Sequence, residues 1–362
     1  MRSLSDTIGR LAAVRNLRAR ENPVPATTAL IELTDFGSNP GALAGWYYVP
    51  DSAKPGAPLV VVLHGCTQNA AGYDHGAGWS QLAAEHGFAV LVPEQRRSNN
   101  MNLCFNWYEP GDSKRGGGEP LSIVQMIAAM IDRHGLDPAR IYVNGLSAGG
   151  AMTSVMLATY PEIFAGGAII AGLAYGTANG VPQAFDRMRG HGGPQAAGLA
   201  ELVRAASPHT GPWPSIAVWH GTSDHIVNAS NGDAILAQWL GVHGIAGQPD
   251  AEDRIDGYPH RLWRGADGCV AIEDYRITGM GHGTPLSTRG DDGCGASGAH
   301  MLEVAISSTR HIARSWGLLD ETRKAIPRAN PATANDHGTA TPVTVGVGKV
   351  IEDALRAAGL MR

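Results

Sequence analysis

Apolar positions divide the chain into short strands that alternate with amphipathic helices. Leu59–Leu63 is a continuous apolar run, the pattern of a parallel strand that is covered on both faces. Ser122–Arg133 instead repeats its apolar residues at helical spacing. Further strands are expected at Ala29–Thr34, Trp46–Val49, Ala89–Val92, Ile141–Val143, Gly167–Ile170, Ile216–Trp219 and Ala271–Ile277. Further helices are expected at Trp79–His86, Ile235–Leu240 and Met301–Trp316.

This alternation predicts the α/β class, with a mostly parallel central sheet, helices on both faces and an opening pair of antiparallel strands. We expect one main domain over residues 26–320, interrupted by a glycine- and proline-rich, lid-like insertion at 173–214. Residues 321–342 have the proline, alanine and threonine content of a linker, and 343–362 are expected to end in a short helix.

Residues 1–25 form a separate basic segment. Five arginines lie between and around apolar residues at helical spacing, namely Leu4, Ile8, Leu11, Val14 and Leu17. Asp6, Arg10 and Arg15 interrupt any apolar stretch, so the segment does not have the pattern of a secretory signal peptide. It is interpreted as a helix that packs on its own domain, or alternatively as an amphipathic helix that lies on a lipid or polymer surface.

The overall composition excludes two classes of partner. A net charge of −5 lacks the basic footprint of a nucleic-acid-binding protein. No apolar run approaches the roughly 20 residues that a transmembrane helix needs. A length of 362 residues allows one large core, and 48 glycines with 22 prolines favour a loop-rich globular enzyme.

The motif Gly145-x-Ser147-x-Gly149 lies between the strand Ile141–Val143 and an alanine- and methionine-rich helical stretch. In that context it is the pattern of a nucleophile elbow. A sharp turn there holds the serine in strained backbone, and the glycines let neighbouring backbone pass close by. The hydroxyl then stands at a helix N-terminus, where backbone N–H groups can stabilise an oxyanion. We therefore expect Ser147 to be a nucleophile.

A serine nucleophile needs a base and an acid that orients the base. Asp224 lies in a turn directly after the buried strand Ile216–Trp219, where such an acid is expected. It could alternatively cap that turn. Asp233 is the next candidate, but its helical stretch favours a solvated face.

His282 is the expected base. It follows the strand Ala271–Ile277 in a glycine-rich turn, at the right point in the order serine, acid, histidine. His220 and His225 flank the acid and are interpreted as structural or pocket-lining residues.

The oxyanion hole needs two N–H donors. One is expected from Ala148, the residue after the nucleophile. The other is expected from the loop after Leu59–Leu63, which begins His64-Gly65 and places the N–H of Cys66 in the hole, with Thr67 next to it.

Three motifs together resemble the poly(3-hydroxybutyrate) depolymerase-type esterases, relatives of the feruloyl and acetylxylan esterases of carbohydrate esterase family one. They are His64-Gly-Cys-Thr-Gln68, Phe105-Asn-Trp-Tyr108 and Gly145-Leu-Ser-Ala-Gly-Gly-Ala-Met152, within a resemblance that covers roughly Leu30 to Leu318. The resemblance implies an α/β-hydrolase fold and a triad of Ser147, Asp224 and His282. It also places Asn106 and Trp107 against the substrate, although Trp107 could instead be a core residue.

By resemblance the chain is a serine esterase that acts on hydroxyalkanoate esters through an acyl-enzyme. A feruloyl or acetylxylan esterase is the alternative, and a non-catalytic surface-associated binding protein a more remote one. The segment after the main domain is too short for a separate polymer-binding module, which favours oligomers, amorphous polyester or small esters over crystalline polymer.

The four cysteines are expected to form two disulfides. No pair has metal-ligand spacing, so a zinc site is not expected. No other metal and no cofactor are expected either. Cys66 and Cys104 lie in segments expected to meet at the site, and Cys269 and Cys294 bracket the His282 turn. Disulfides and the resemblance favour an extracellular or periplasmic location, whereas the N-terminal sequence favours the cytoplasm.

Overall fold

The computed structural model describes residues 28–319. The expected N-terminal helix, the linker at 321–342 and the C-terminal helix at 343–362 lie outside these residues. Among residues 28–319, no helix is long and apolar enough to cross a membrane.

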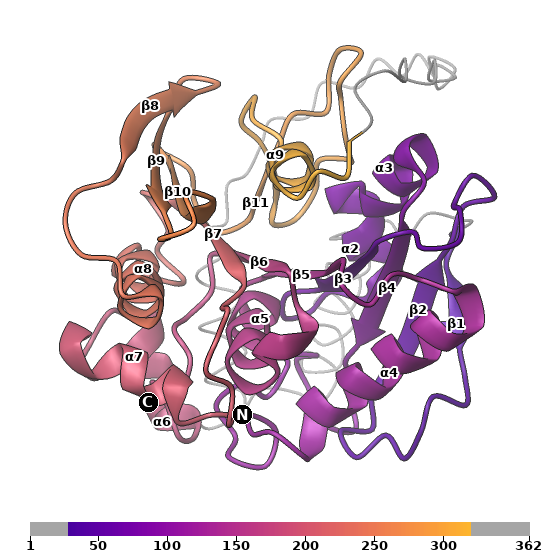
Figure 1. Ribbon diagram of the computed structural model, residues 1–362, viewed down its shortest axis with the longest axis horizontal. Helices are drawn as coiled ribbons and strands as arrows, with labels where there is room; N and C mark the ends of the chain where they lie inside the picture. The colour runs from indigo at the N-terminus through magenta and orange to yellow at the C-terminus, as the bar shows by residue number, and fades with distance from the viewer. Residues whose placement is uncertain (1–27, 320–362) are drawn as a thin grey trace, which may run out of the picture. The chain divides into compact units, whose positions relative to one another are not determined.

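A ten-stranded sheet runs through the domain in the order β1-β2-β4-β3-β5-β6-β7-β10-β9-β8 (Figure 1). Its strands are β1 (Ile31–Leu33), β2 (Ala44–Tyr48), β3 (Leu59–Leu63), β4 (Ala89–Glu94), β5 (Ile141–Leu146), β6 (Gly166–Ile170), β7 (Ser215–Gly221), β8 (Ala251–Ile255), β9 (Tyr258–Arg264) and β10 (Val270–Ile277). The six central strands, β4, β3, β5, β6, β7 and β10 in sheet order, pair in parallel. The strands at the two edges pair antiparallel. The predicted fold class and the antiparallel opening pair are confirmed.

The helices divide between the two faces of this sheet. They are α2 (Ala70–Ala77), α3 (Trp79–His86), α4 (Gly118–His134), α5 (Ala148–Thr159), the 3₁₀ turn η1 (Pro161–Ile163), α6 (Val181–Met188), α7 (Ala196–Arg204), α8 (Ser230–His243) and α9 (Ser308–Ser315). Successive side chains of a strand point to opposite faces. Val61 of β3 accordingly belongs to one core with buried residues of α4, α5 and α8, and Val62 to a second core with residues of α2, α3 and α9.

Local signals explain where several helices begin and end. The side chain of Asn69 caps α2 by accepting the N–H of Gly72 at 2.8 Å. Gly78 ends that helix and Gly135 ends α4, both in the left-handed conformation that glycine adopts most readily.

The predicted closing helix at Met301–Trp316 is wrong in its first half. Met301–Glu303 forms strand β12, which pairs in parallel with β11 (Thr284–Leu286), and α9 begins only at Ser308. Ser307 caps α9 by accepting the N–H of Arg310, so the helix starts at its own capping residue. Apolar spacing alone did not distinguish a three-residue strand from a helical turn.

The insertion at 173–214 contains α6 and α7. Leu199 and Val203 of α7 are buried in the same core as Trp239 of α8, and the Leu199 carbonyl accepts a hydrogen bond from Gln238 Nε2 at 3.0 Å. This half of the insertion is therefore packed on the domain, and its lid-like role stays a prediction.

Candidate active site

Ser147 occupies the sharp turn between β5 and α5. Its backbone has φ 58° and ψ −117°, a conformation that L-residues with side chains rarely adopt. The Ser147 N–H donates to Ile170 of β6 at 2.9 Å, which anchors the turn to the neighbouring strand. Ser147 is partly exposed whereas Leu146 and Ala148 on either side are buried. The turn therefore has the geometry of a nucleophile elbow.

Both glycines of the motif are required by close backbone contacts. A Cβ atom on Gly145 would lie 2.4 Å from the carbonyl oxygen of Gly149. A Cβ atom on Gly149 would lie 2.2 Å from the carbonyl oxygen of Leu63 and 2.5 Å from that of His64. The first turn of α5 thus packs directly on the end of β3, where the predicted oxyanion loop begins.

We expect Gly149→Ala to destabilise the protein by about 3 kcal/mol, because backbone cannot yield as a flexible side chain can. The matched control is Gly198→Ala in α7, where a new Cβ would lie 3.9 Å from Pro194, an ordinary van der Waals contact. That control should gain about 0.5–1 kcal/mol from higher helix propensity. Urea denaturation measures both variants, and equal effects would contradict the packing argument.

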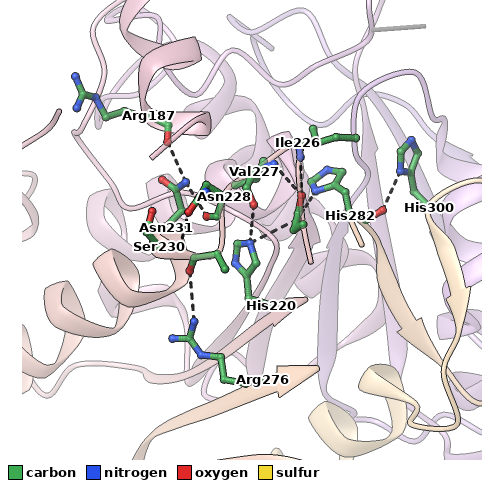
Figure 2. Close-up of polar contacts among 12 residues, drawn as sticks. Arg187, His220, Ile226, Val227, Asn228, Ser230, Asn231, Arg276, His282 and His300 are labelled. Carbon is green, nitrogen blue, oxygen red and sulfur yellow. Dashed lines mark hydrogen bonds and ion pairs between the residues drawn. The ribbon is translucent and has the colours of Figure 1, made fainter. Parts of the chain in front are cut away.

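His282 and Asp224 form a direct hydrogen-bonded pair (Figure 2). His282 Nδ1 lies 2.7 Å from Asp224 Oδ2, and the N–H groups of Ile226 and Val227 donate to Asp224 Oδ1, each at 2.9 Å. Because the carboxylate accepts at Nδ1, Nε2 is the nitrogen left to accept a proton. Asp224 follows β7, and His282 follows the adjacent parallel strand β10. Ser147 follows β5, so all three residues stand at the carboxyl edge of the sheet.

The Asp224 side chain is fully buried, yet it is held as an anion. Burial by itself would raise the pKa of Asp224, but hydrogen bonds from His220 and His282 and the charge of His282 outweigh burial and hold the pKa well below its usual range. His220 Nε2 lies 2.9 Å from the Val227 carbonyl and 3.5 Å from Asp224 Oδ2, so His220 lies beside the same carboxylate that His282 contacts.

Asp233 has the surroundings expected of a surface residue. Its side chain is 68% exposed and pairs with Arg276 at 2.9 Å. The structure therefore leaves Asp224 as the carboxylate beside His282.

His300 is a neighbour of the site that no sequence pattern indicated. Its Nδ1 lies 3.0 Å from the backbone oxygen of His282, and the two rings meet edge to face with centroids 5.6 Å apart (Figure 2). The Thr284 N–H donates to the His300 carbonyl at 2.8 Å, so His300 holds the chain on both sides of Gly283. This contact depends on the pairing of β11 with β12, which is non-local.

The loop after β3 lies against the elbow. A Cβ atom on Gly65 would lie 3.5 Å from the carbonyl oxygen of Leu146. The Thr67 N–H donates to the Asn102 carbonyl at 2.6 Å, so its donor is already used. That engagement leaves Cys66 as the residue of this pair whose N–H suits the oxyanion hole, with Ala148 supplying the other. Both roles stay predictions.

The Cys66–Cys104 disulfide is confirmed, with a sequence separation of 38 residues. The predicted Cys269–Cys294 disulfide is wrong. Cys269 is exposed near the turn between β9 and β10, whereas Cys294 is buried, where its Sγ contacts the carbonyl oxygens of Ala77 and Gly78. The two cysteines bracket His282 in sequence, but β10 and the loop before β12 carry them to different surroundings.

Removal of the disulfide by Cys66→Ala with Cys104→Ala is expected to destabilise the protein by about 4 kcal/mol in the chain-entropy model. We also expect kcat to fall, because the disulfide holds the predicted oxyanion loop against the segment that carries Trp107. Thermal unfolding and ester hydrolysis measure the two effects. Cys269→Ser is the control and should change stability by less than about 0.5 kcal/mol; an equal loss in that control would contradict the prediction.

Asn106 and Trp107 are both 8% exposed. The ring of Trp107 meets that of Tyr108 edge to face at 5.4 Å, and Trp107 belongs to the core that contains α4 and α5. Most of the Trp107 side chain is therefore buried in the core, as the alternative interpretation of Trp107 predicts. Contact with substrate stays a prediction for both residues.

Beneath this aromatic loop lies a buried acid, Glu119 of α4. Its carboxylate accepts the side-chain amide of Gln95 at 2.6 Å and the backbone N–H of Asn106 at 2.9 Å. Burial, with the nearby charge of Asp112, raises the pKa of Glu119 to about 8. No sequence pattern indicated this network, since its members come from three separate segments.

Between pH 4.5 and about 8, Glu119 should therefore be protonated in the folded protein. In the unfolded chain Glu119 has its ordinary pKa of 4.5 and has lost the proton over this range. Stability falls as pH rises from that value to about 8, by up to about 1.4 kcal/mol per pH unit for one proton. Thermal unfolding from pH 5 to 8 should show a shallower loss in Glu119→Gln than in wild type. The exposed control Glu201→Gln should retain the wild-type slope; a wild-type slope in Glu119→Gln would refute the assignment.

The chain is similar in sequence and in structure to known esterases. A family model described as esterase PHB depolymerase matches residues 43–256. Poly(3-hydroxyalkanoate) depolymerase C of Paucimonas lemoignei is 45% identical over 80% of this chain and 70% of its own length. Feruloyl esterase B of Talaromyces stipitatus is 29% identical over 73% of this chain and 74% of its own. The solved acetyl xylan esterase from Aspergillus awamori has a TM-score of 0.68 at 25% identity, covering 80% of this chain and 99% of that one.

Proposed function

The chain belongs to the esterase PHB depolymerase family, whose relatives are carboxylic ester hydrolases, and from that premise we propose that it cleaves hydroxyalkanoate esters with Ser147 as nucleophile. The observation that carries the proposal is the 2.7 Å contact between His282 Nδ1 and Asp224 Oδ2 at the sheet edge where Ser147 stands. An ester is the substrate class, and hydroxyalkanoate is the acyl chemistry named in the relative that is 45% identical.

The proposed reaction begins with attack of Ser147 Oγ on the ester carbonyl carbon while His282 Nε2 takes the serine proton. The Asp224 carboxylate stabilises the imidazolium that forms. The N–H groups of Cys66 and Ala148 donate to the negatively charged carbonyl oxygen. As the C–O bond to the leaving group breaks, His282 returns the proton to that oxygen and releases an alcohol.

Deacylation repeats these steps with water in place of the serine hydroxyl. His282 takes a proton from the water, the resulting hydroxide attacks the acyl carbon, and the free acid leaves as Ser147 regains its proton. In this proposal Asn106 and Trp107 form the wall of the site that faces the acyl chain.

A second candidate is hydrolysis of feruloyl or acetyl esters of plant polysaccharide. It is favoured by two observations: the 29% identity to a feruloyl esterase and the structural similarity to an acetyl xylan esterase. The mechanism would be the same, and the acyl and alcohol groups would differ.

Purified protein should be assayed in parallel on p-nitrophenyl butyrate, a 3-hydroxybutyrate oligomer and methyl ferulate, with Ser147→Ala as the blank. We expect the highest kcat/KM on the hydroxybutyrate oligomer. A preference for methyl ferulate would select the second candidate. Hydrolysis of none of the three would favour the non-catalytic binding protein and overturn the proposal.

We also propose that the chain consists of a basic helical segment at residues 1–25, a domain at 26–320, a linker at 321–342 and a short helix at 343–362. The first segment packs on its own domain or, as the alternative, associates with a lipid or polymer surface. The arginines and spaced apolar residues of the first segment support its role. If this segment binds a surface, the full-length protein should co-sediment with anionic vesicles or with polyester particles. A variant without residues 1–25 should then stay in the supernatant.

A further inference from the structure

His64, the first residue of the predicted oxyanion loop, is fully buried and makes two hydrogen bonds whose directions are fixed by their partners. Its Nδ1 lies 2.8 Å from the Gly65 carbonyl oxygen, which can only accept. Its Nε2 lies 3.1 Å from the backbone N–H of Gln95, which can only donate. His64 is therefore neutral with its proton on Nδ1.

The surroundings of His64 maintain this state. Burial lowers the pKa of His64 to about 4, so the ring does not become charged at neutral pH. The ring of Phe105 packs on it with centroids 5.0 Å apart. This histidine is thus not a second base, since its one accepting nitrogen is already occupied by the Gln95 N–H.

The bond from Nδ1 acts on one particular peptide unit. The carbonyl of Gly65 and the N–H of Cys66 belong to the same peptide, and in a planar trans peptide these two groups point in opposite directions. A hydrogen bond that fixes the Gly65 carbonyl therefore also fixes the direction of the Cys66 N–H. The Gln68 N–H donates to the same carbonyl at a longer 3.3 Å.

We propose that His64 is a positioning residue, which by holding the Gly65 carbonyl aims the Cys66 N–H at the oxyanion of the transition state. The inference rests on the proposed function, because it assigns a purpose to the oxyanion hole used there. It adds that the rate depends on a donor at the Nδ1 position of residue 64, and not merely on a side chain that fills the space.

Gln95 connects His64 to the segment that carries Cys104. Its backbone holds His64, while its side-chain amide donates to the Cys104 carbonyl at 3.0 Å and to Glu119 at 2.6 Å. Cys104 is itself bonded to Cys66 through the disulfide. Gln95, a buried residue directly after β4, thus holds the oxyanion loop at two points: at His64 by its backbone, and at Cys66 through Cys104.

Two substitutions separate the roles of the histidine nitrogens. An asparagine amide can reach the place of Nδ1, so His64→Asn can still donate to Gly65. A glutamine amide reaches the place of Nε2, so His64→Gln retains the contact with Gln95 and loses the donor. Both variants remove the ring, so a purely structural role predicts similar losses of Tm and of kcat in the two.

We expect His64→Gln to lower kcat on p-nitrophenyl butyrate by about 10²-fold, near the lower end of the effect of losing one oxyanion donor. His64→Asn should lie within about tenfold of wild type, a partial rescue by the retained donor. KM should change little in either variant, because the donor acts on the transition state more than on the bound ester. Equal kcat in the two variants, or an unchanged kcat in His64→Gln, would overturn the inference.

A measurement on the wild-type protein guards against variants that do not fold. Long-range ¹H–¹⁵N NMR should show residue 64, assigned through its connection to Gly65, as a neutral ring with the proton on Nδ1 from pH 5 to 8. An Nε2–H tautomer or a charged ring would overturn the inference. Wild type that hydrolyses no ester would instead overturn the proposed function, so the two failures are distinguishable.

Discussion

Replacing Ser147 by alanine is expected to lower kcat by about 10⁴- to 10⁶-fold, the usual cost of losing the nucleophile of a catalytic triad. In the proposed reaction the Ser147 hydroxyl oxygen forms the acyl-enzyme, and alanine offers no oxygen in its place. KM should change far less, because the walls that bind the ester remain.

Stability of Ser147→Ala should stay close to that of wild type. The residue has φ 58°, and alanine meets the same backbone strain there as serine does. Ser154→Ala is the matched control: it removes a hydroxyl in α5, the helix that follows Ser147, where it donates to the Gly150 carbonyl at 3.4 Å, away from the proposed chemistry. Initial rates with a folded variant decide the matter, and activity above a few per cent of wild type would show that Ser147 is not the nucleophile.

Replacing Asp224 by asparagine is expected to lower kcat by about 10⁴-fold. An asparagine fits the space, but its amide can present N–H groups to His282 Nδ1 and so favour the tautomer with the proton on Nε2. The base then has no free nitrogen facing the serine, and the imidazolium loses its buried counter-charge. The fully buried carboxylate makes the second loss severe, because water cannot substitute for it.

Asp233→Asn provides the control for charge. It removes one negative charge from an exposed side chain of α8 that pairs with the largely buried Arg276. We expect kcat within about twofold of wild type, because His282 contacts Asp224 and not Asp233. Comparable rate losses in the two variants would place the acid elsewhere.

The strands and helices around the elbow could be predicted because their signals are local. Leu59–Leu63 was predicted with its observed bounds, since five consecutive apolar residues bury both faces of a strand. The elbow itself needed only Gly145, Ser147 and Gly149, and the resemblance built partly on it is confirmed by a family match over residues 43–256.

Polar edge strands were harder to predict. The hairpin of β8 and β9 was missed, because Ala251–Ile255 carries charged residues and no apolar run. Its pairing with β10 supplies the backbone partners that make it a strand. Strand β12 was missed for a different reason: its apolar residues also fit helical spacing, and three residues become a strand only through their register with β11.

The α/β class and the family could be predicted from the amino-acid sequence, because apolar runs, helical spacing and the motif around Ser147 are each local patterns. The roles of Ser147, Asp224 and His282 rest on their order along the chain and stay predictions. The tertiary structure was needed to separate the two predicted cysteine pairs, since Cys66 bonds to Cys104 whereas Cys269 and Cys294 do not bond to each other. It also decided that His64, Gln95 and Glu119 form one buried network behind the oxyanion loop. Such contacts join residues that are distant in sequence and become neighbours when parallel strands align, so no local pattern records them.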